Sequence, residues 1–347
     1  MRLYGEEIEK KEFLKKIGDM SMLADAREGI LTSGKGDGVR IIDIKTGGGL
    51  EFTVLPTRGM DIAWAEYKGI PLSYISKTGV VHPSYFEARG DAFLRNFFCG
   101  LVTTCGLTSF GTPEKDGAEE LGLHGRISNT PAEDVCVDKE WNGNDYTIKA
   151  RGKIKESCVF KENLCLTREI TTGLGKKSFV IKDIVENKGY DESPFMLLYH
   201  INLGYPVVSR ESVLLTPEGT SVCARDDVGE VEKYNVFQEP EHGYKEQVFY
   251  LDIPAVKDNC SYAAIFNRKL KLGVYVKFDR EAFTNFSEWK MMGEGEYVVG
   301  MEPATARPEG RKKARENGEL IMLKPEEKKV YTFEIGVFED EKSLGGI

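Results

Sequence analysis

Three residues whose side chains can transfer protons stand in apolar segments far apart in the sequence. They are His124 in Leu-Gly-Leu-His-Gly-Arg, His200 in Met-Leu-Leu-Tyr-His-Ile-Asn-Leu-Gly, and Glu302 in Tyr-Val-Val-Gly-Met-Glu-Pro. A strand that buries a histidine or a carboxylate carries a desolvation cost unless a partner satisfies that group. Two histidines and a carboxylate also suit acid–base catalysis near neutral pH. The set therefore predicts a catalytic cleft that only the folded chain assembles.

Glu302 is the expected general base of this set. Side chains alternate along a strand, so Glu302 lies on the face opposite Met301 and Val299. Pro303 favours an extended residue 302 and lacks a backbone donor, so we expect strand pairing to end there and the carboxylate to project from the strand end. The alternative is a structural salt bridge with an arginine, because charged side chains are rarely buried unpaired.

The two histidines also have structural alternatives. His200 can be a core histidine whose ring is hydrogen-bonded, the more frequent case for a lone histidine on a strand. His124 lies between Gly122 and Gly125, where the backbone can approach a ligand closely, and its alternative is a turn residue. We predict no metal, because the sequence has neither a His-Glu-x-x-His motif nor close ligand spacing.

The composition describes a globular protein of 347 residues with a net charge of −9. This charge argues against a nucleic acid or an anionic membrane as partner, because phosphate groups require a basic surface. The seven cysteines are odd in number and include no Cys-x-x-Cys pair, which argues against a disulfide framework or a zinc ribbon. No apolar stretch resembles a signal peptide or a membrane span. We therefore expect a reduced, cytoplasmic protein.

The elements that position these residues are mostly strands. Residues 6–24 predict one helix within an amino-terminal extension of residues 1–30, and residues 78–98 predict a long ordered excursion across a sheet. The basic run 307–315 is expected to be a solvated loop. Short β-rich runs predict strands at 39–44, 51–55, 61–67, 146–151, 163–170, 178–187, 195–200, 213–216, 248–252, 262–266, 272–278, 297–301 and 330–338. No linker divides the chain, so we predict a single all-β domain of two large antiparallel sheets packed face to face.

Several enzyme classes lack support in the sequence. There is no phosphate-binding Gly-x-x-x-x-Gly-Lys-[Ser/Thr] loop, no Gly-x-Ser-x-Gly elbow, and no strand–Gly-x-Gly-x-x-Gly–helix unit. A glycosidase that uses two carboxylates needs a second one beside Glu302, and nothing in the sequence identifies that second carboxylate.

The ordered segments Leu-His124-Gly, Tyr-His200-Ile-Asn-Leu-Gly and Gly-Met-Glu302-Pro-x-x-x-x-Pro308 resemble the aldose 1-epimerase (galactose mutarotase-like) superfamily. The sequences of residues 55–62 (Leu-Pro-Thr-Arg-Gly-Met-Asp-Ile) and of residues 93–107 resemble the DUF4432 branch of this superfamily. The resemblance covers roughly residues 30–340. It implies a β-supersandwich and an enzyme that interconverts the α and β anomers of a free sugar without metal or cofactor.

The resemblance also implies roles for the three residues. Glu302 takes the proton of the anomeric hydroxyl, His200 protonates the ring oxygen, and His124 hydrogen-bonds and polarises the sugar. The chain departs from the better-known mutarotases in having Gly-Arg-Ile at residues 125–127, where they have Gly-Gly after the first histidine. The counterpart of their ligand-binding aspartate is not evident, although residues 241–244 occupy about the right region.

Further residues are candidates for contacts with the sugar. Arg58 and Arg95 present fixed forks of donors to hydroxyls or acidic substituents, and their alternative is structural pairing with carboxylates such as Asp61. Asp61 itself and Asn202 are also candidate sugar ligands, and Trp289 could stack on a sugar ring or belong to the core. The expected partner is a small-molecule sugar, and a homodimer is an open possibility.

Two other functions remain as alternatives. One is a non-catalytic sugar-binding or sensing protein, against which the intact pair His200 and Glu302 argues. The other is an isomerase or epimerase of a phosphorylated sugar. The second alternative requires that arginines converge on a phosphate, and the candidates are Arg58, Arg95, Arg126 and Arg307.

Overall fold

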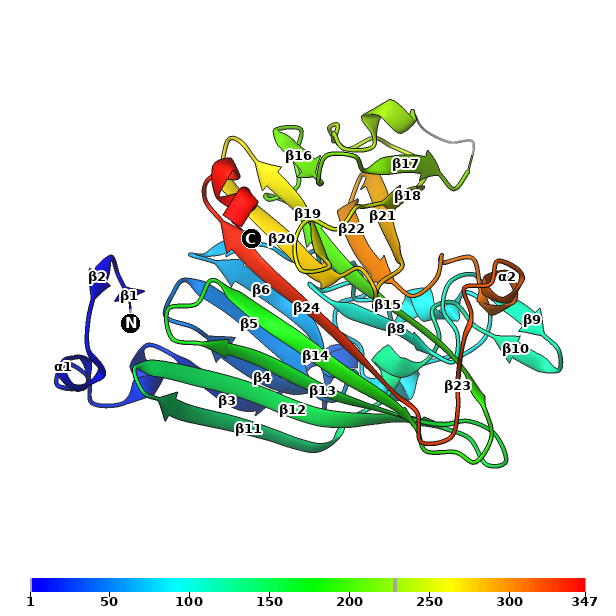
Figure 1. The fold of residues 1–347 in the computed structure, drawn as a ribbon, viewed down its shortest axis with the longest axis horizontal. Coiled ribbons are helices and arrows are strands. Elements are labelled where there is room, and N and C mark those ends of the chain that lie inside the picture. The colour runs from blue at the N-terminus through cyan, green and yellow to red at the C-terminus, as the bar shows by residue number, and fades with distance from the viewer. Residues whose placement is uncertain (1, 227–229, 347) are drawn as a thin grey trace.

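The first of two packed layers is an eight-stranded antiparallel sheet (Figure 1). The computed structural model describes residues 2–226 and 230–346. The strand order is β11-β12-β13-β14-β24-β20-β19-β16. The strands span Glu133–Asn142 (β11), Asp145–Ser157 (β12), Asn163–Gly173 (β13), Ser178–Asn187 (β14), Ser212–Leu215 (β16), Cys260–Asn267 (β19), Leu272–Asp279 (β20) and Lys328–Phe338 (β24).

The second layer consists of two antiparallel sheets that lie side by side. One has the order β3-β4-β5-β6-β7, and the other has the order β17-β18-β21-β22-β15-β23, with β8 paired to β15. A bridge between Ile62 and Val102 joins them. Their strands span Asp25–Ile30 (β3), Arg40–Lys45 (β4), Leu50–Leu55 (β5), Asp61–Tyr67 (β6), Ile70–Pro71 (β7), Thr103–Leu107 (β8), Ser193–Gly204 (β15), Ser221–Ala224 (β17), Gln247–Asp252 (β18), Asn285–Gly293 (β21), Glu296–Ala304 (β22) and Ile321–Leu323 (β23).

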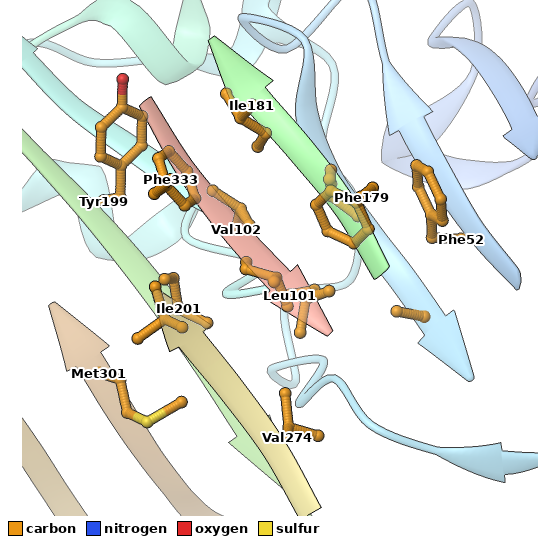
Figure 2. Close-up of a cluster of buried hydrophobic side chains, with 14 of the residues drawn as sticks. Phe52, Leu101, Val102, Phe179, Ile181, Tyr199, Ile201, Val274, Met301 and Phe333 are labelled. Atoms are coloured by element: carbon orange, nitrogen blue, oxygen red, sulfur yellow. The ribbon is translucent and has the colours of Figure 1, made fainter. Parts of the chain in front are cut away.

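The core lies between the two layers. Figure 2 shows Phe179 of β14 and Phe333 of β24 in the same cluster as Phe52 of β5, Ile201 of β15 and Met301 of β22. Burying a side chain of this size contributes about 1.5–3 kcal/mol relative to leaving it in water. Because Ile201 and Met301 point into the core, their neighbours His200 and Glu302 must point to the outer face of the second layer.

A segment of residues 73–100, here called the arm, crosses that outer face. Backbone bridges join Ser73 to Leu203 of β15 and Ile75 to Cys99 within the arm. Val80 and Phe98 of the arm form an apolar cluster with residues of β5 and β6. The predicted excursion across one sheet is thus confirmed, and residues of the arm line two separate hollows.

The amino-terminal helix is much shorter than predicted. Residues 6–24 contain strand β2 (Glu6–Glu7), helix α1 (Lys10–Leu14) and a 3₁₀ turn, η1 (Met20–Met22). Phe13 is the buried residue of α1, so a longer helix would have little apolar face to pack. The side chain of Asp19 accepts a hydrogen bond from the Ser21 amide and begins the separate η1 turn.

The basic run 307–315 is also not simply a solvated loop. It enters helix α2 (Arg311–Glu316), in which the buried Arg311 forms ion pairs with Asp116 at 2.6 Å and Glu119 at 2.5 Å. These carboxylates belong to the hairpin of β9 (Glu114–Asp116) and β10 (Glu119–Leu121). The remaining short elements are β1 (Arg2–Leu3), η2 (Gly34–Gly36), η3 (Pro83–Tyr85), η4 (Ala92–Arg95), η5 (Ile127–Asn129), η6 (Val231–Lys233) and η7 (Glu341–Gly346).

The predicted strands are all present, and most extend beyond their predicted ends. The prediction missed several others, including β8 and β21, which are buried on both faces and so lack clear alternation. Within the described residues, every helix is too short or too polar to cross a membrane.

Candidate active site

Strand register brings His200 and Glu302 together. Leu198 pairs with Ala304 and Ile201 with Met301, so the register sets His200 beside Glu302 on neighbouring strands. Strand β22 continues through Pro303, which pairs with Phe286, so the prediction that pairing ends at Glu302 was wrong. Pro303 is tolerated inside the strand, and the carboxylate points out from the face of the sheet rather than from a strand end.

Gly300 provides the space that this arrangement needs. A Cβ atom at position 300 would lie 2.8 Å from Glu302 Oε1 and 3.0 Å from His200 Cε1. Both distances are shorter than ordinary carbon contacts. Glycine at this position therefore lets the two side chains approach each other above the sheet.

His200 and Glu302 form a buried pair in which the ionised histidine would be a cation and the ionised glutamate an anion. His200 Nε2 lies 3.1 Å from Glu302 Oε1, and the two side chains are 5% and 4% exposed. The atoms lack the angular geometry of a hydrogen bond, and Glu302 Oε1 and His200 Nδ1 have no hydrogen-bond partner among the described residues. Two polar groups buried in this way cost stability, as catalytic groups often do.

Burial shifts the pKa of both groups. It raises the pKa of Glu302 to about 8, with a further rise from the charge of Glu246 and an opposing effect of Arg225. It lowers the pKa of His200 to about 3, and His124 lowers it further. Between these two pKa values the pair holds one proton, which can reside on either residue.

His124 approaches the pair from a loop. Its φ of 58° is left-handed, and its backbone is held by hydrogen bonds with Gly106 and Gly111. Its ring lies 5.8 Å from that of His200, and burial lowers its pKa to about 4. A Cβ atom on Gly125 would lie 2.3 Å from the Ser109 carbonyl oxygen, so this glycine serves the packing of the loop rather than the approach of a ligand.

The three side chains line one cavity of about 670 Å³ on the outer face. This volume is in the usual range of small-molecule sites. Trp289 and Phe97 form apolar parts of its wall, and the ring of each lies 5.1 Å from that of His200. Proton-transferring groups beside aromatic surfaces suit a ligand with both hydroxyl groups and an apolar ring face.

The rim of the cavity contains a fixed carboxylate that the sequence reasoning missed. Glu246 Oε2 accepts a hydrogen bond of 2.8 Å from Trp289 Nε1, and Glu246 Oε1 lies 3.2 Å from Arg225 Nη2. Glu246 stands two residues beyond the segment 241–244, so position in the chain was the available signal. Lys313, inside the basic run, also lines the cavity.

Four predicted sugar contacts lie elsewhere. Arg58 is fully buried outside the cavity lining and donates to the backbone carbonyls of Ser128, Val81 and Asn96, so its guanidinium does not face a ligand. Asp61 is fully buried beside Arg168, at 3.3 Å, and accepts from the Thr104 amide. These expectations are corrected: both residues are structural.

Arg95 and Asn202 are likewise outside the cavity lining. Arg95 is exposed on the arm, and Asn202 is buried with its amide donating to the His200 carbonyl oxygen. Arg126 is exposed, and the guanidinium of Arg307 lies 4.6 Å from the Tyr250 ring centre. The convergence of arginines that a phosphorylated substrate requires is therefore not found, whereas Trp289 does line the site.

A metal site is not evident in the described parts of the chain, where no three His, Cys, Asp or Glu side chains are arranged to hold an ion.

The fold is a β-supersandwich of the galactose mutarotase-like class. Residues 36–337 match the family described as Domain of unknown function (DUF4432), and the chain belongs to this family.

Solved structures support the same class. A candidate aldose 1-epimerase from Klebsiella pneumoniae has 25% sequence identity and a TM-score of 0.86, covering 98% of this chain and 88% of that chain. A galactose mutarotase-like protein from Clostridium acetobutylicum has 16% identity and a TM-score of 0.65, covering 92% and 99%. Galactose 1-epimerase from Lactobacillus acidophilus has 13% identity and a TM-score of 0.57, covering 92% and 100%. No curated protein sequence matches the chain.

Proposed function

We propose that this protein is an aldose 1-epimerase that interconverts the anomers of a free sugar by opening and closing its ring. The observation that carries the proposal is the buried pair His200 and Glu302, 3.1 Å apart at the cavity floor with His124 beside it. The fold shared with the Klebsiella pneumoniae protein supports it.

In the proposed reaction, Glu302 removes the proton from the anomeric hydroxyl. The O–H electron pair forms the C1 carbonyl, the C1–O5 bond breaks, and O5 takes a proton from His200. Rotation about C1–C2 and the reverse transfers give the other anomer. His124 orients the sugar, and because C1 keeps its oxidation state when the ring opens, the reaction needs no redox cofactor.

The cavity favours an unphosphorylated sugar. The ionisable residues at its rim are the three carboxylates Asp226, Glu246 and Glu309 and the two cations Arg225 and Lys313. An excess of carboxylates repels a phosphate group, whereas carboxylates accept hydrogen bonds from sugar hydroxyls.

The test is exchange NMR of anomers over a panel of free aldoses, deoxysugars and sugar phosphates. Glu302→Gln and His200→Asn should each reduce the exchange rate by about 10²–10⁴-fold, because each removes a proton-transfer group. The partly exposed Glu296, on the same strand and outside the cavity, provides the matched control Glu296→Gln, which should keep full activity.

The outcome separates the alternatives. A fully active Glu302→Gln protein would contradict the assignment of the base. Sugar binding without any acceleration by the wild-type protein would favour a binding or sensing function on the same fold.

A further inference from the structure

A second hollow lies on the outer face of the same layer, over the sheet of β3 to β7. Its volume is about 540 Å³, and the first residues of the arm, Ser73 and Ile75, form one wall. Its floor is the outer face of β4, β5 and β6. This floor carries Asp43, Trp64 and Glu66, because their sheet neighbours point into the core.

Trp64 is the aromatic surface of this hollow. The side chain is 40% exposed, and among the described residues its indole has neither a hydrogen-bond partner nor a neighbouring ring in contact. The register of β5 and β6 shifts between Phe52 and Val54, at the level of Trp64. This bulge turns Ala63 under the arm and leaves Trp64 open to solvent.

Two carboxylates stand beside the indole in an arrangement that the fold itself does not favour. Glu51 and Glu66 are directly opposite each other on β5 and β6, and like charges in this position destabilise a sheet. Neither forms a salt bridge within the described part of the chain. Their oxygens are therefore available as acceptors for a ligand.

The hollow also contains donors that balance its charge. Lys45 lies opposite Glu51, and Arg27 lies opposite Asp43, which already accepts a hydrogen bond from Thr53. Two cations against three carboxylates leave little net charge to attract an ion. An aromatic face with both acceptors and donors around it instead suits an uncharged polyhydroxylated ring.

We propose that this hollow is a non-catalytic saccharide-binding site in which a sugar ring stacks on Trp64 and donates its hydroxyls to Glu51 and Glu66. The site is separate from the proposed catalysis, because no histidine lines it and the two hollows share no lining residue.

The experiment follows the indole ¹H–¹⁵N signals of the full chain during titration with glucose, galactose and their disaccharides. The three tryptophans 64, 141 and 289 are assigned by single substitutions with phenylalanine. We expect a saturable shift of the Trp64 signal, and about tenfold weaker binding at this signal in Glu51→Gln/Glu66→Gln. Tyr190→Ala, which removes an exposed aromatic ring outside this hollow in the connection between β14 and β15, should leave the shift unchanged.

The Trp64→Ala protein should exchange anomers at the wild-type rate. The proposal for this site and the proposed catalysis are therefore tested by different measurements, and either can fail without the other. The proposal is overturned if the Trp64 signal does not move at saccharide concentrations up to about 100 mM, well above the Kd of a millimolar site. It is also overturned if the signal moves with protein concentration instead, since a second copy of the chain would then cover this face.

Discussion

The pair His200 and Glu302 derives its properties from burial more than from mutual attraction. Neither ring nor carboxylate has the hydrogen bonds that would hold its charge, so both favour their neutral forms at neutral pH. Moving one proton from Glu302 to His200 creates the ionised form without changing the total charge. A ring-opening reaction that takes one proton and returns another needs a pair of this kind.

The exchange rate should therefore depend on pH in a defined direction. The one-proton pair is present between the pKa values of about 3 and about 8, so the rate should fall above pH 8 as this proton is lost. The measurement is anomer exchange by NMR from pH 5 to 9.5 after subtraction of the uncatalysed rate. Glu246→Gln should move this fall to lower pH, because the Glu246 charge raises the pKa of Glu302.

A rate that rises through pH 8 would contradict this interpretation. It would mean that fully ionised Glu302 beside neutral His200 is the active form.

At the scale of elements, strand β22 and the strands beside it determine how closely His200 and Glu302 can approach each other. Gly300 lies opposite Trp289 of β21, on the same face as Glu302. Residue 300 thus lies below the space that His200 and Glu302 share. Because residue 300 is glycine, no Cβ atom lies there to separate His200 from Glu302.

Gly300→Ala should lower the exchange rate by about 10–10²-fold. The added Cβ atom would be too close to Glu302 and His200 and would push both side chains out of position. Gly293→Ala on β21 is the control, since its new Cβ meets the flexible end of Met291. The comparison uses kcat and thermal unfolding together. Equal losses of activity in both variants would show that the effect is not specific to residue 300.

Strand β12 supports the loop of His124 from outside the site. The buried Glu156 carboxylate accepts hydrogen bonds from the Leu107 amide at 2.7 Å and from the Thr108 hydroxyl at 2.5 Å. The chain continues from there to Gly111, whose carbonyl accepts the His124 amide. Glu156 is thus a positioning residue that holds the end of β8 and the loop after it.

Glu156→Gln should reduce kcat about tenfold, because a misplaced His124 orients the sugar less well. It should also lower the free energy of unfolding by about 1–3 kcal/mol, the cost of an unsatisfied buried group. A shift of the His124 ring signals in NMR distinguishes repositioning from general destabilisation. Unchanged His124 signals with reduced activity would argue against the positioning role.

At the scale of the whole molecule, a buried ionic network joins the two layers. Arg168 of β13 lies 2.6 Å from Asp183 of β14 and 3.3 Å from Asp61 of β6, and all three are fully buried. The Tyr199 hydroxyl of β15 also bonds to Asp183. The network therefore links the eight-stranded sheet to the strands that carry the site.

Arg168→Met should destabilise the protein by about 3–5 kcal/mol, because it leaves two buried carboxylates without their cation. Arg151→Met, which removes an exposed ion pair with Asp138, should cost at most about 1 kcal/mol. Urea unfolding at neutral pH measures both. A small effect at Arg168 would mean that the buried network contributes little to the free energy of unfolding.

The sequence by itself determined the class of the fold and its catalytic candidates. Alternating runs such as residues 178–187 predicted large antiparallel sheets, because period two is a local property of a half-buried strand. His124, His200 and Glu302 could be singled out because polar groups in apolar segments need a reason. The long amino-terminal helix was wrong because its apolar spacing is a local signal, whereas the residue that the helix buries is Phe13, which is not one of the residues at that spacing.

Only the tertiary structure decided which polar residues face the cavity. Arg58 and Asp61 have the chemistry of sugar ligands, yet the packing of the layers and loops directs them to carbonyl oxygens and to Arg168. Glu246 and Lys313 carry no local signal, yet strand register and the helix α2 bring them to the rim. Burial, and with it the shifted pKa of Glu302, is a property of what surrounds a side chain, and most of those surroundings are distant in the sequence.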